Sequence, residues 1–181
     1  DAVRYLSEWT GMAPEAVPHP ARQPAATWTP VLPVPADAPP LVAPNGTARV
    51  YNPKRADSDK AWTTLRPEMV HVYRNIDGVP LGYVLRCTFR DGGKFTPQVT
   101  WCGNAAGEYR WCLIPFPEPR PLYGLDRLKG RKPGNVVIVE GEKCADVARP
   151  FLDFPVLSWP GGANGVGHVD WTPLAGWKPL I

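Results

Sequence analysis

The sequence has few residues suited to a metal site and no segment suited to a membrane. Its four cysteines include no Cys-x-x-Cys pair, which argues against zinc bound by cysteine alone. No apolar run of about 18 residues and no signal peptide is visible. We therefore expect reduced thiols, a cytoplasmic location and no membrane partner. The three histidines, His19, His71 and His168, lie far apart in the chain.

Two common catalytic signatures are also missing. There is no Gly-x-Ser-x-Gly motif and no Ser-His-Asp order. The segment 160–165, PGGANG, lacks the Lys-Ser/Thr ending of a P-loop, so it is interpreted as a tight turn. The net charge of +3 does not by itself indicate a nucleic-acid partner. The basic run 120–132 leaves two interpretations open, contact with phosphates or a solvated turn; it includes Arg127, Arg131 and Lys132.

Proline is the residue in excess. The chain has 24 prolines, where an ordinary usage of about 5% would give roughly nine. Ten of them lie between Pro14 and Pro44. Proline fixes φ and lacks an N–H, so residues 14–48 are predicted to form a semi-rigid extended linker. Before it, residues 1–13 have apolar side chains at helical spacing and are predicted to form a helix.

Residues 49–121 carry a β pattern. Four segments alternate or are rich in β-branched and aromatic residues, and glycine-containing turns separate them. The pattern predicts a meander of about four antiparallel strands. Trp101 and Trp111 in this region would either stack on single-stranded bases or pack in the core, and core packing is the preferred interpretation. The four strands are expected at Met69–Asn75, Leu81–Arg90, Lys94–Trp101 and Glu108–Ile114.

Residues 122–181 change to an alternation of strands and helices. Asn135–Val139 is a continuous apolar run, Gly141–Arg149 is predicted to be helical, and Phe154–Trp159 and Lys178–Ile181 are predicted strands. This order implies a parallel sheet with right-handed crossovers. The sequence thus predicts an α+β protein: an N-terminal helix and Pro-rich linker, an antiparallel β-meander, and the start of an α/β domain with a parallel sheet.

Glu140 is the first polar residue after the predicted strand Asn135–Val139. Ligands of parallel α/β sheets bind at the carboxyl ends of strands, where Glu140 would lie. Gly141 permits a sharp turn or the close approach of a phosphate. A carboxylate in this place suits a hard cation such as Mg²⁺. The competing interpretation is that Glu140 or Glu142 merely caps the following helix.

Three segments resemble one protein family. The strings VVIVEGEKCADVA, VLSWPGGANGV and DWTPLAGWKPLI look like the TOPRIM domain of phage- and plasmid-type DNA primases. The resemblance implies that Glu140 is a catalytic and metal-binding residue for Mg²⁺ or Mn²⁺, and that Gly141, Gly161 and Gly162 shape the loop of the site. It also implies phosphate or nucleic-acid contacts, which we expect from Lys143, Arg127, Arg131 and Lys132. Cys144 departs from the family, which typically has Asp there.

The resemblance also implies a function for the intact protein. A primase synthesises primers on a single-stranded DNA template from nucleoside triphosphates, and a replicative helicase or helicase domain is a further expected partner. Residues 1–13 would end an upstream zinc-finger module, the only expected place for Zn²⁺. Residues 122–181 would be the first part of the TOPRIM domain, with an Asp-x-Asp pair expected after Ile181, so this segment alone is expected to be inactive. Two alternatives stay open: a TOPRIM nuclease or topoisomerase-like protein, and a non-catalytic DNA-binding or replication-scaffold module.

Overall fold

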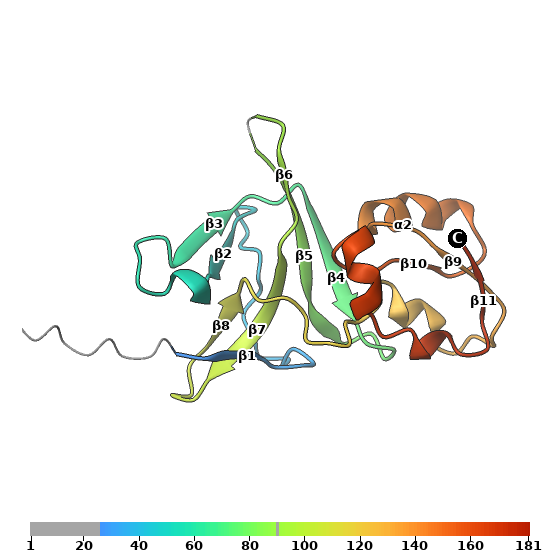
Figure 1. Ribbon diagram of the computed structural model, residues 1–181, viewed down its shortest axis with the longest axis horizontal. Helices are drawn as coiled ribbons and strands as arrows, with labels where there is room; N and C mark the ends of the chain where they lie inside the picture. Colours follow the sequence, from blue (N-terminus) through green and yellow to red (C-terminus); the bar gives the residue numbers. More distant parts are fainter. Residues whose placement is uncertain (1–25, 90) are drawn as a thin grey trace, which may run out of the picture.

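The computed structural model describes residues 26–89 and 91–181, which form two packed units (Figure 1). A large β-sheet occupies one side, and a small sheet with a single α-helix occupies the other. A hairpin made by the end of β5 and by β6 projects beyond the large sheet. None of the helices in these residues is long and apolar enough to cross a bilayer.

The large sheet contains eight strands. Its main path runs β3-β2-β8-β7-β5-β4, while β1 pairs with β7 and β6 pairs with β5. Every pairing is antiparallel except the parallel contact of β2 with β8, so the sheet is mixed. The strands are β1 (Trp28–Pro30), β2 (Ala48–Tyr51), β3 (Trp62–Leu65), β4 (Met69–Arg74), β5 (Pro80–Thr88), β6 (Lys94–Phe95), β7 (Gln98–Asn104) and β8 (Tyr109–Cys112).

Strand β5 is buried on both faces because side chains of a strand alternate between the two faces of the sheet. Leu85 and Cys87 point into a core shared with β2, β7 and β8. Val84 points the other way, into a second core with Tyr73 and residues of the small unit. The large sheet therefore has one face free to pack against the small unit, and that face carries the candidate site.

The small unit is built on a three-stranded parallel sheet in the order β10-β9-β11. Val136 and Leu157 are completely buried between this sheet and the turn η2. The elements are β9 (Asn135–Ile138), α2 (Glu142–Ala148), β10 (Val156–Leu157) and β11 (Lys178–Leu180). The remaining helical segments are short 3-10 turns: η1 (Pro53–Arg55), η2 (Leu125–Leu128), η3 (Arg149–Phe151), η4 (Ala163–His168) and η5 (Thr172–Leu174).

The predicted fold class is wrong. Strand makes up 34% and helix 17% of the structure, and the main sheet is mixed with mostly antiparallel strands, so the chain is not an α/β TOPRIM fold on a parallel sheet. The only α-helix among the described residues, α2, has seven residues. Between β10 and β11 the chain contains prolines and many glycines, which interrupt helices, and it forms the turns η4 and η5 instead of a crossover helix. The predicted helix at residues 1–13 lies outside the described residues.

The predicted linker is also wrong from residue 28 onward. Trp28–Pro30 pairs with β7 as strand β1. Val34 and Leu41 are buried in the core of the large sheet. The apolar residues between the prolines supply buried area that an extended spacer would leave in water, and proline is tolerated in an edge position such as that of Pro30.

Three of the four predicted strands of the meander are present with shifted ends, as β4, β5 and β8. The predicted strand Lys94–Trp101 is divided into β6 and β7, and the sheet holds more strands than the four expected. Trp101 and Trp111 are 8% and 6% exposed and pack against each other with ring centroids 5.1 Å apart. The preferred interpretation of core packing is therefore confirmed, because neither ring presents a face on which a base could stack.

Candidate functional site

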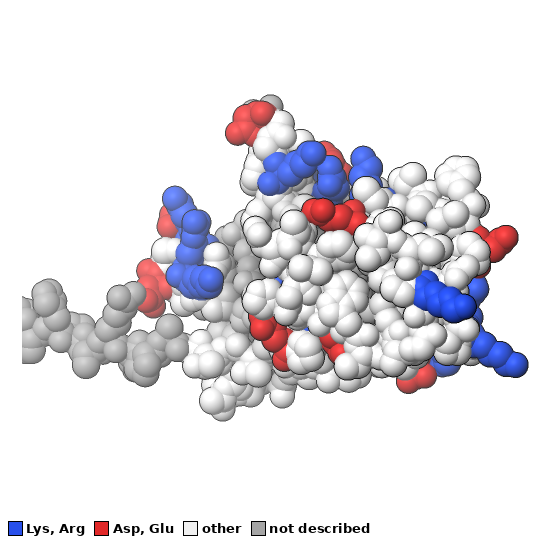
Figure 2. Space-filling view, turned by 45° about the vertical axis from the view of Figure 1, so that its right-hand side comes forward, with Lys and Arg blue, Asp and Glu red and all other residues white. Residues whose placement is uncertain are grey.

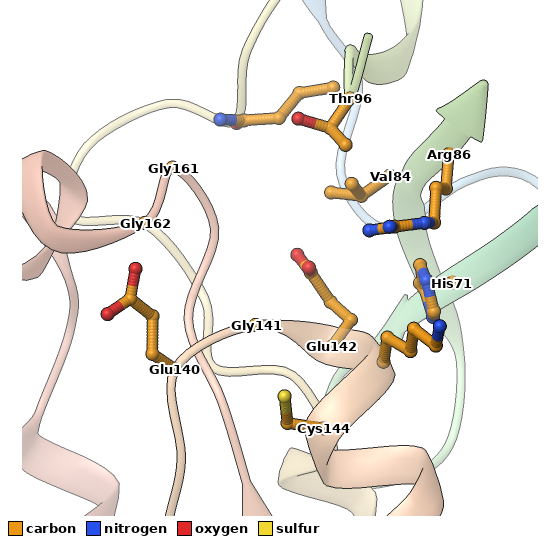
Figure 3. A pocket seen from close by; sticks show the side chains of 12 residues that line it. His71, Val84, Arg86, Thr96, Glu140, Gly141, Glu142, Cys144, Gly161 and Gly162 are labelled. Carbon is orange, nitrogen blue, oxygen red and sulfur yellow. The ribbon is translucent and has the colours of Figure 1, made fainter. Parts of the chain in front are cut away.

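A pocket of about 690 Å³ lies where the large sheet meets the small unit (Figure 3). One wall comes from β4, β5 and the start of β7. The other comes from the end of β9, the first residues of α2 and the glycine loop after β10. The lining residues are His71, Val84, Arg86, Thr96 and Gln98 on the first wall, and Glu140–Cys144, Gly161 and Gly162 on the second.

Two glycines set the shape of the second wall. Gly141 has φ 85° and Gly162 has φ 60°, a region that side-chain-bearing residues rarely adopt. A Cβ on Gly162 would lie 3.4 Å from Glu140 Oε1, so the carboxylate packs directly against this glycine. The turn at Gly141 lets α2 begin at Glu142, so the Glu140 side chain lies between the carboxyl end of β9 and the start of the helix.

Glu140 is exposed, and its carboxylate makes no hydrogen bond or ion pair with any described residue. Figure 3 shows its side chain directed toward the loop that carries Gly161 and Gly162. Helix capping, the competing interpretation of this glutamate, does not occur: Gly141 is the N-cap residue of α2, and no side chain caps the helix. Glu140 is therefore free to bind a ligand.

Glu142, by contrast, is held by the large sheet. The Tyr73 hydroxyl donates a 2.6 Å hydrogen bond to Glu142 Oε1. Tyr73 is fully buried, and its ring lies 4.7 Å from Phe116 and 5.2 Å from Tyr123. Burial raises the pKa of Tyr73 well above its ordinary value, and the negative charge of Glu142 raises it further. The phenol therefore remains a proton donor at neutral pH and fixes the Glu142 carboxylate at the rim of the pocket.

A second contact of the same kind joins α2 to β4. His71 Nδ1 lies 2.9 Å from Asp146 Oδ2. Asp146 Oδ1 accepts from the Tyr123 hydroxyl at 2.8 Å and from the Arg149 guanidinium. Glu142 and Asp146 are one turn apart on the helix, and His71 and Tyr73 are on one face of the strand, so the two contacts match in spacing. Asp146 thus secures the helix to the sheet and does not line the pocket.

The pocket also contains cations without partners. Arg86 is half-buried, Lys143 is exposed, and neither makes an ion pair or side-chain hydrogen bond with a described residue. Figure 2 shows Lys and Arg side chains gathered at the base of the projecting β5–β6 hairpin, above a group of Asp and Glu side chains. Arg86 and Lys143 can bind an anionic group of a ligand by charge-assisted hydrogen bonds, and the Glu140 carboxylate can bind a cation.

The structure brings together five of the residues predicted from the sequence: Glu140, Gly141, Lys143, Gly161 and Gly162. The other three lie elsewhere. Arg131 and Lys132 line a separate hollow beside Trp177, where Arg131 Nη1 donates to Asp153 O at 3.3 Å. Arg127 lines a third hollow with Asp126, Asp146 and Arg149.

Sequence reasoning missed Arg86 and His71. Both belong to the antiparallel strands, and nothing local in the sequence connects them with Glu140, which lies more than 50 residues further along the chain. The available signal was alternation: Val84 and Arg86 share one face of β5, and His71 pairs with Val84 across the sheet. That signal places them beside one another without indicating what packs above them.

The described residues contain no group of three His, Cys, Asp or Glu side chains that could enclose a metal ion. Mg²⁺ does not require such a cage, because it is commonly held by one or two carboxylates together with waters and the phosphates of a substrate. A Glu140 carboxylate without a partner among the described residues, in a pocket that Arg86 and Lys143 also line, fits a divalent ion that is bound jointly with a phosphate group.

No protein-family model, no curated protein and no solved structure matches this chain. Its function is therefore inferred from the pocket and from the sequence motif around Glu140.

Proposed function

We propose that this chain is part of a DNA primase and that the pocket binds a nucleoside triphosphate together with Mg²⁺ or Mn²⁺ for nucleotidyl transfer. The observation that supports this proposal is that one carboxylate, Glu140, and two cations, Arg86 and Lys143, line one cavity without ion-pair partners among the described residues. The volume of about 690 Å³ falls in the range of about 300–1,000 Å³ for small-ligand sites. Single-stranded DNA would be the template.

In this reaction a primer 3′-hydroxyl attacks the α-phosphorus of a nucleoside triphosphate, and pyrophosphate leaves. When bound, a divalent ion would neutralise charge on the phosphate oxygens and align the reacting groups. Glu140 would hold this ion from the protein side. Arg86 and Lys143 bind phosphate oxygens by charge-assisted hydrogen bonds. Gly162, which has no side chain, lets a phosphate approach the backbone next to Glu140.

The resemblance of VVIVEGEKCADVA to primases and the geometry of the pocket support the proposal independently. The resemblance selects Glu140 from the sequence alone. The pocket selects the same residue by its position and by its lack of a partner. Neither line of support uses Arg127, Arg131 or Lys132, and the phosphate contacts expected of these three residues have no place in this pocket.

The experiment is a calorimetric titration of the chain with adenosine triphosphate and Mn²⁺. We expect binding that requires both, and a loss of about tenfold or more in Glu140→Gln, because the ion would lose its protein ligand. Asp153→Asn is the matched control, since Asp153 is also exposed but lies in a different hollow. Equal affinity in wild type and Glu140→Gln would contradict the proposal. Binding of single-stranded DNA without any metal-dependent nucleotide binding would favour the non-catalytic scaffold instead.

A further inference from the structure

His71 is placed in the pocket in an unusually well-defined orientation. Its side chain is only 4% exposed, yet the residue lines the cavity. Nδ1 lies 2.9 Å from Asp146 Oδ2, and the ring meets Tyr123 edge-on at 5.6 Å. Asp146 is itself fixed by the Tyr123 hydroxyl and by Arg149. An ionised carboxylate only accepts hydrogen bonds, so Nδ1 carries the proton of this contact.

The other ring nitrogen is the one that faces the cavity. Nε2 makes no hydrogen bond with any described residue. Among the described residues, the side-chain polar atoms that are buried and lack a hydrogen-bond partner belong to Trp28, Arg120 and Ser158. Nε2 of His71 also lacks a partner but is not one of these atoms, so it is not completely buried. Because the ring lines the pocket, Nε2 opens onto it. Figure 3 shows His71 beside Arg86 on one side of the pocket, with Glu140 on the opposite side.

We propose that His71 contacts the bound nucleotide, with Nε2–H donating to a phosphate oxygen while Nδ1–H donates to Asp146. This inference rests on the proposed nucleotide site. It adds to that site a residue from the large sheet, on the same side as Arg86 and opposite Glu140.

The contact has a consequence for protons. A neutral imidazole that donates from Nδ1 has only a lone pair at Nε2, and a phosphate oxygen offers no proton to it. His71 must therefore bind a second proton when the phosphate arrives. The imidazolium is then placed between two anions, the Asp146 carboxylate and the phosphate, and nucleotide binding takes up a proton from solution.

The charged and titratable groups around His71 come from every element that packs on it. The phosphate groups of the ligand add negative charge beside Nε2, which favours the imidazolium. The charged and titratable groups around His71 are Tyr73 on β4, Arg86 on β5, Tyr123 in the loop before η2, Glu140 after β9, Glu142, Lys143, Cys144 and Asp146 on α2, and Arg149 after it.

The test is titration of the chain with adenosine triphosphate and Mn²⁺ in two buffers that differ in ionisation enthalpy, which measures protons exchanged on binding. Wild type should show net proton uptake. His71→Asn keeps an amide donor near the Nδ1 position, for Asp146, and removes Nε2. We expect it to lose the uptake and to bind about tenfold more weakly, as for the loss of a hydrogen bond to a charged group. The matched control is His168→Asn, because His168 is a half-exposed histidine on η4 that pairs with Glu118 outside the pocket.

Two outcomes overturn this inference and leave the nucleotide site intact: wild type that binds without proton uptake, or His71→Asn that binds as tightly as wild type with the same uptake. Absence of any binding by wild type would instead overturn the nucleotide site itself. If His71→Asn does not fold, imidazole ¹⁵N spectra of wild type decide the question. Addition of the nucleotide with Mg²⁺ should shift the Nε2 resonance of His71 and not that of His168; an unmoved His71 resonance would refute the contact.

Discussion

Replacing Tyr73 by Phe removes one hydroxyl from the contact between the two units and leaves the ring in place. The ring packs at 4.7 Å from Phe116 and 5.2 Å from Tyr123, so the core is preserved. What is lost is the 2.6 Å hydrogen bond to Glu142. Hydrogen bonds to charged groups contribute about 1.5–3 kcal/mol to stability. Because Glu142 is half-buried and water competes for its carboxylate, we expect the lower end, about 1.5 kcal/mol.

This loss is measured by urea and thermal unfolding. For a chain of this size, about 1.5 kcal/mol corresponds to a fall in Tm of about 3–6 °C. Tyr109→Phe is the control and should leave Tm unchanged, because Tyr109 is 58% exposed and its hydroxyl makes no hydrogen bond with a described residue. A double-mutant cycle with Glu142→Ala should show that the two losses do not add, since both remove the same hydrogen bond. Unchanged stability in Tyr73→Phe would refute the view that this bond fastens α2 to the large sheet.

Two further predictions concern charge in the pocket and stability at high pH. Arg86→Gln should weaken binding of the metal-bound nucleotide severalfold and make this binding less sensitive to salt, whereas Lys132→Gln should change neither. Calorimetry at two ionic strengths measures both properties. Equal effects of the two substitutions would mean that the phosphates do not bind beside Arg86. Burial raises the pKa of Tyr123 to about 12, so the folded protein keeps this proton while the unfolded chain releases it near the ordinary value of 10.0. The free energy of unfolding should therefore fall as the pH rises from 10.0 toward about 12, and the fall should be shallower in Tyr123→Phe; urea unfolding across that range measures it, and identical slopes would contradict the account.

The local part of the site could be predicted from the sequence because it depends on neighbouring residues. A run of apolar residues ends at Glu140, a glycine follows, and a helical segment begins directly afterwards. Each of these features is set within a few residues, and β9 and α2 appear where the pattern indicates them. The position of Glu140 at the end of a strand therefore needed no knowledge of the remaining chain.

The other wall of the pocket depends on contacts between distant segments. His71 reaches Asp146, and Arg86 lines the same pocket as Glu142, because β4 and β5 pack against α2. The Tyr73–Glu142 pair in this contact is separated by 69 residues. The high proline content led to a different error, the predicted linker. Proline correctly excluded helix between residues 28 and 48, but it did not exclude a short edge strand. Val34 and Leu41, which lie between the prolines, contribute to the core. The fold class was mistaken for a related reason, because a short run of strand and helix was taken as the start of an α/β domain on a parallel sheet.

The central claim is that Glu140 holds a divalent ion together with the phosphates of a nucleotide. It is tested most directly by a crystal structure of the chain with Mn²⁺ and a non-hydrolysable nucleoside triphosphate, in which the anomalous signal locates the metal. The account predicts a manganese peak within coordination distance of the Glu140 carboxylate, with phosphate oxygens completing its shell and Arg86 and Lys143 beside them. Manganese bound elsewhere, or a nucleotide seated outside this pocket, would contradict it.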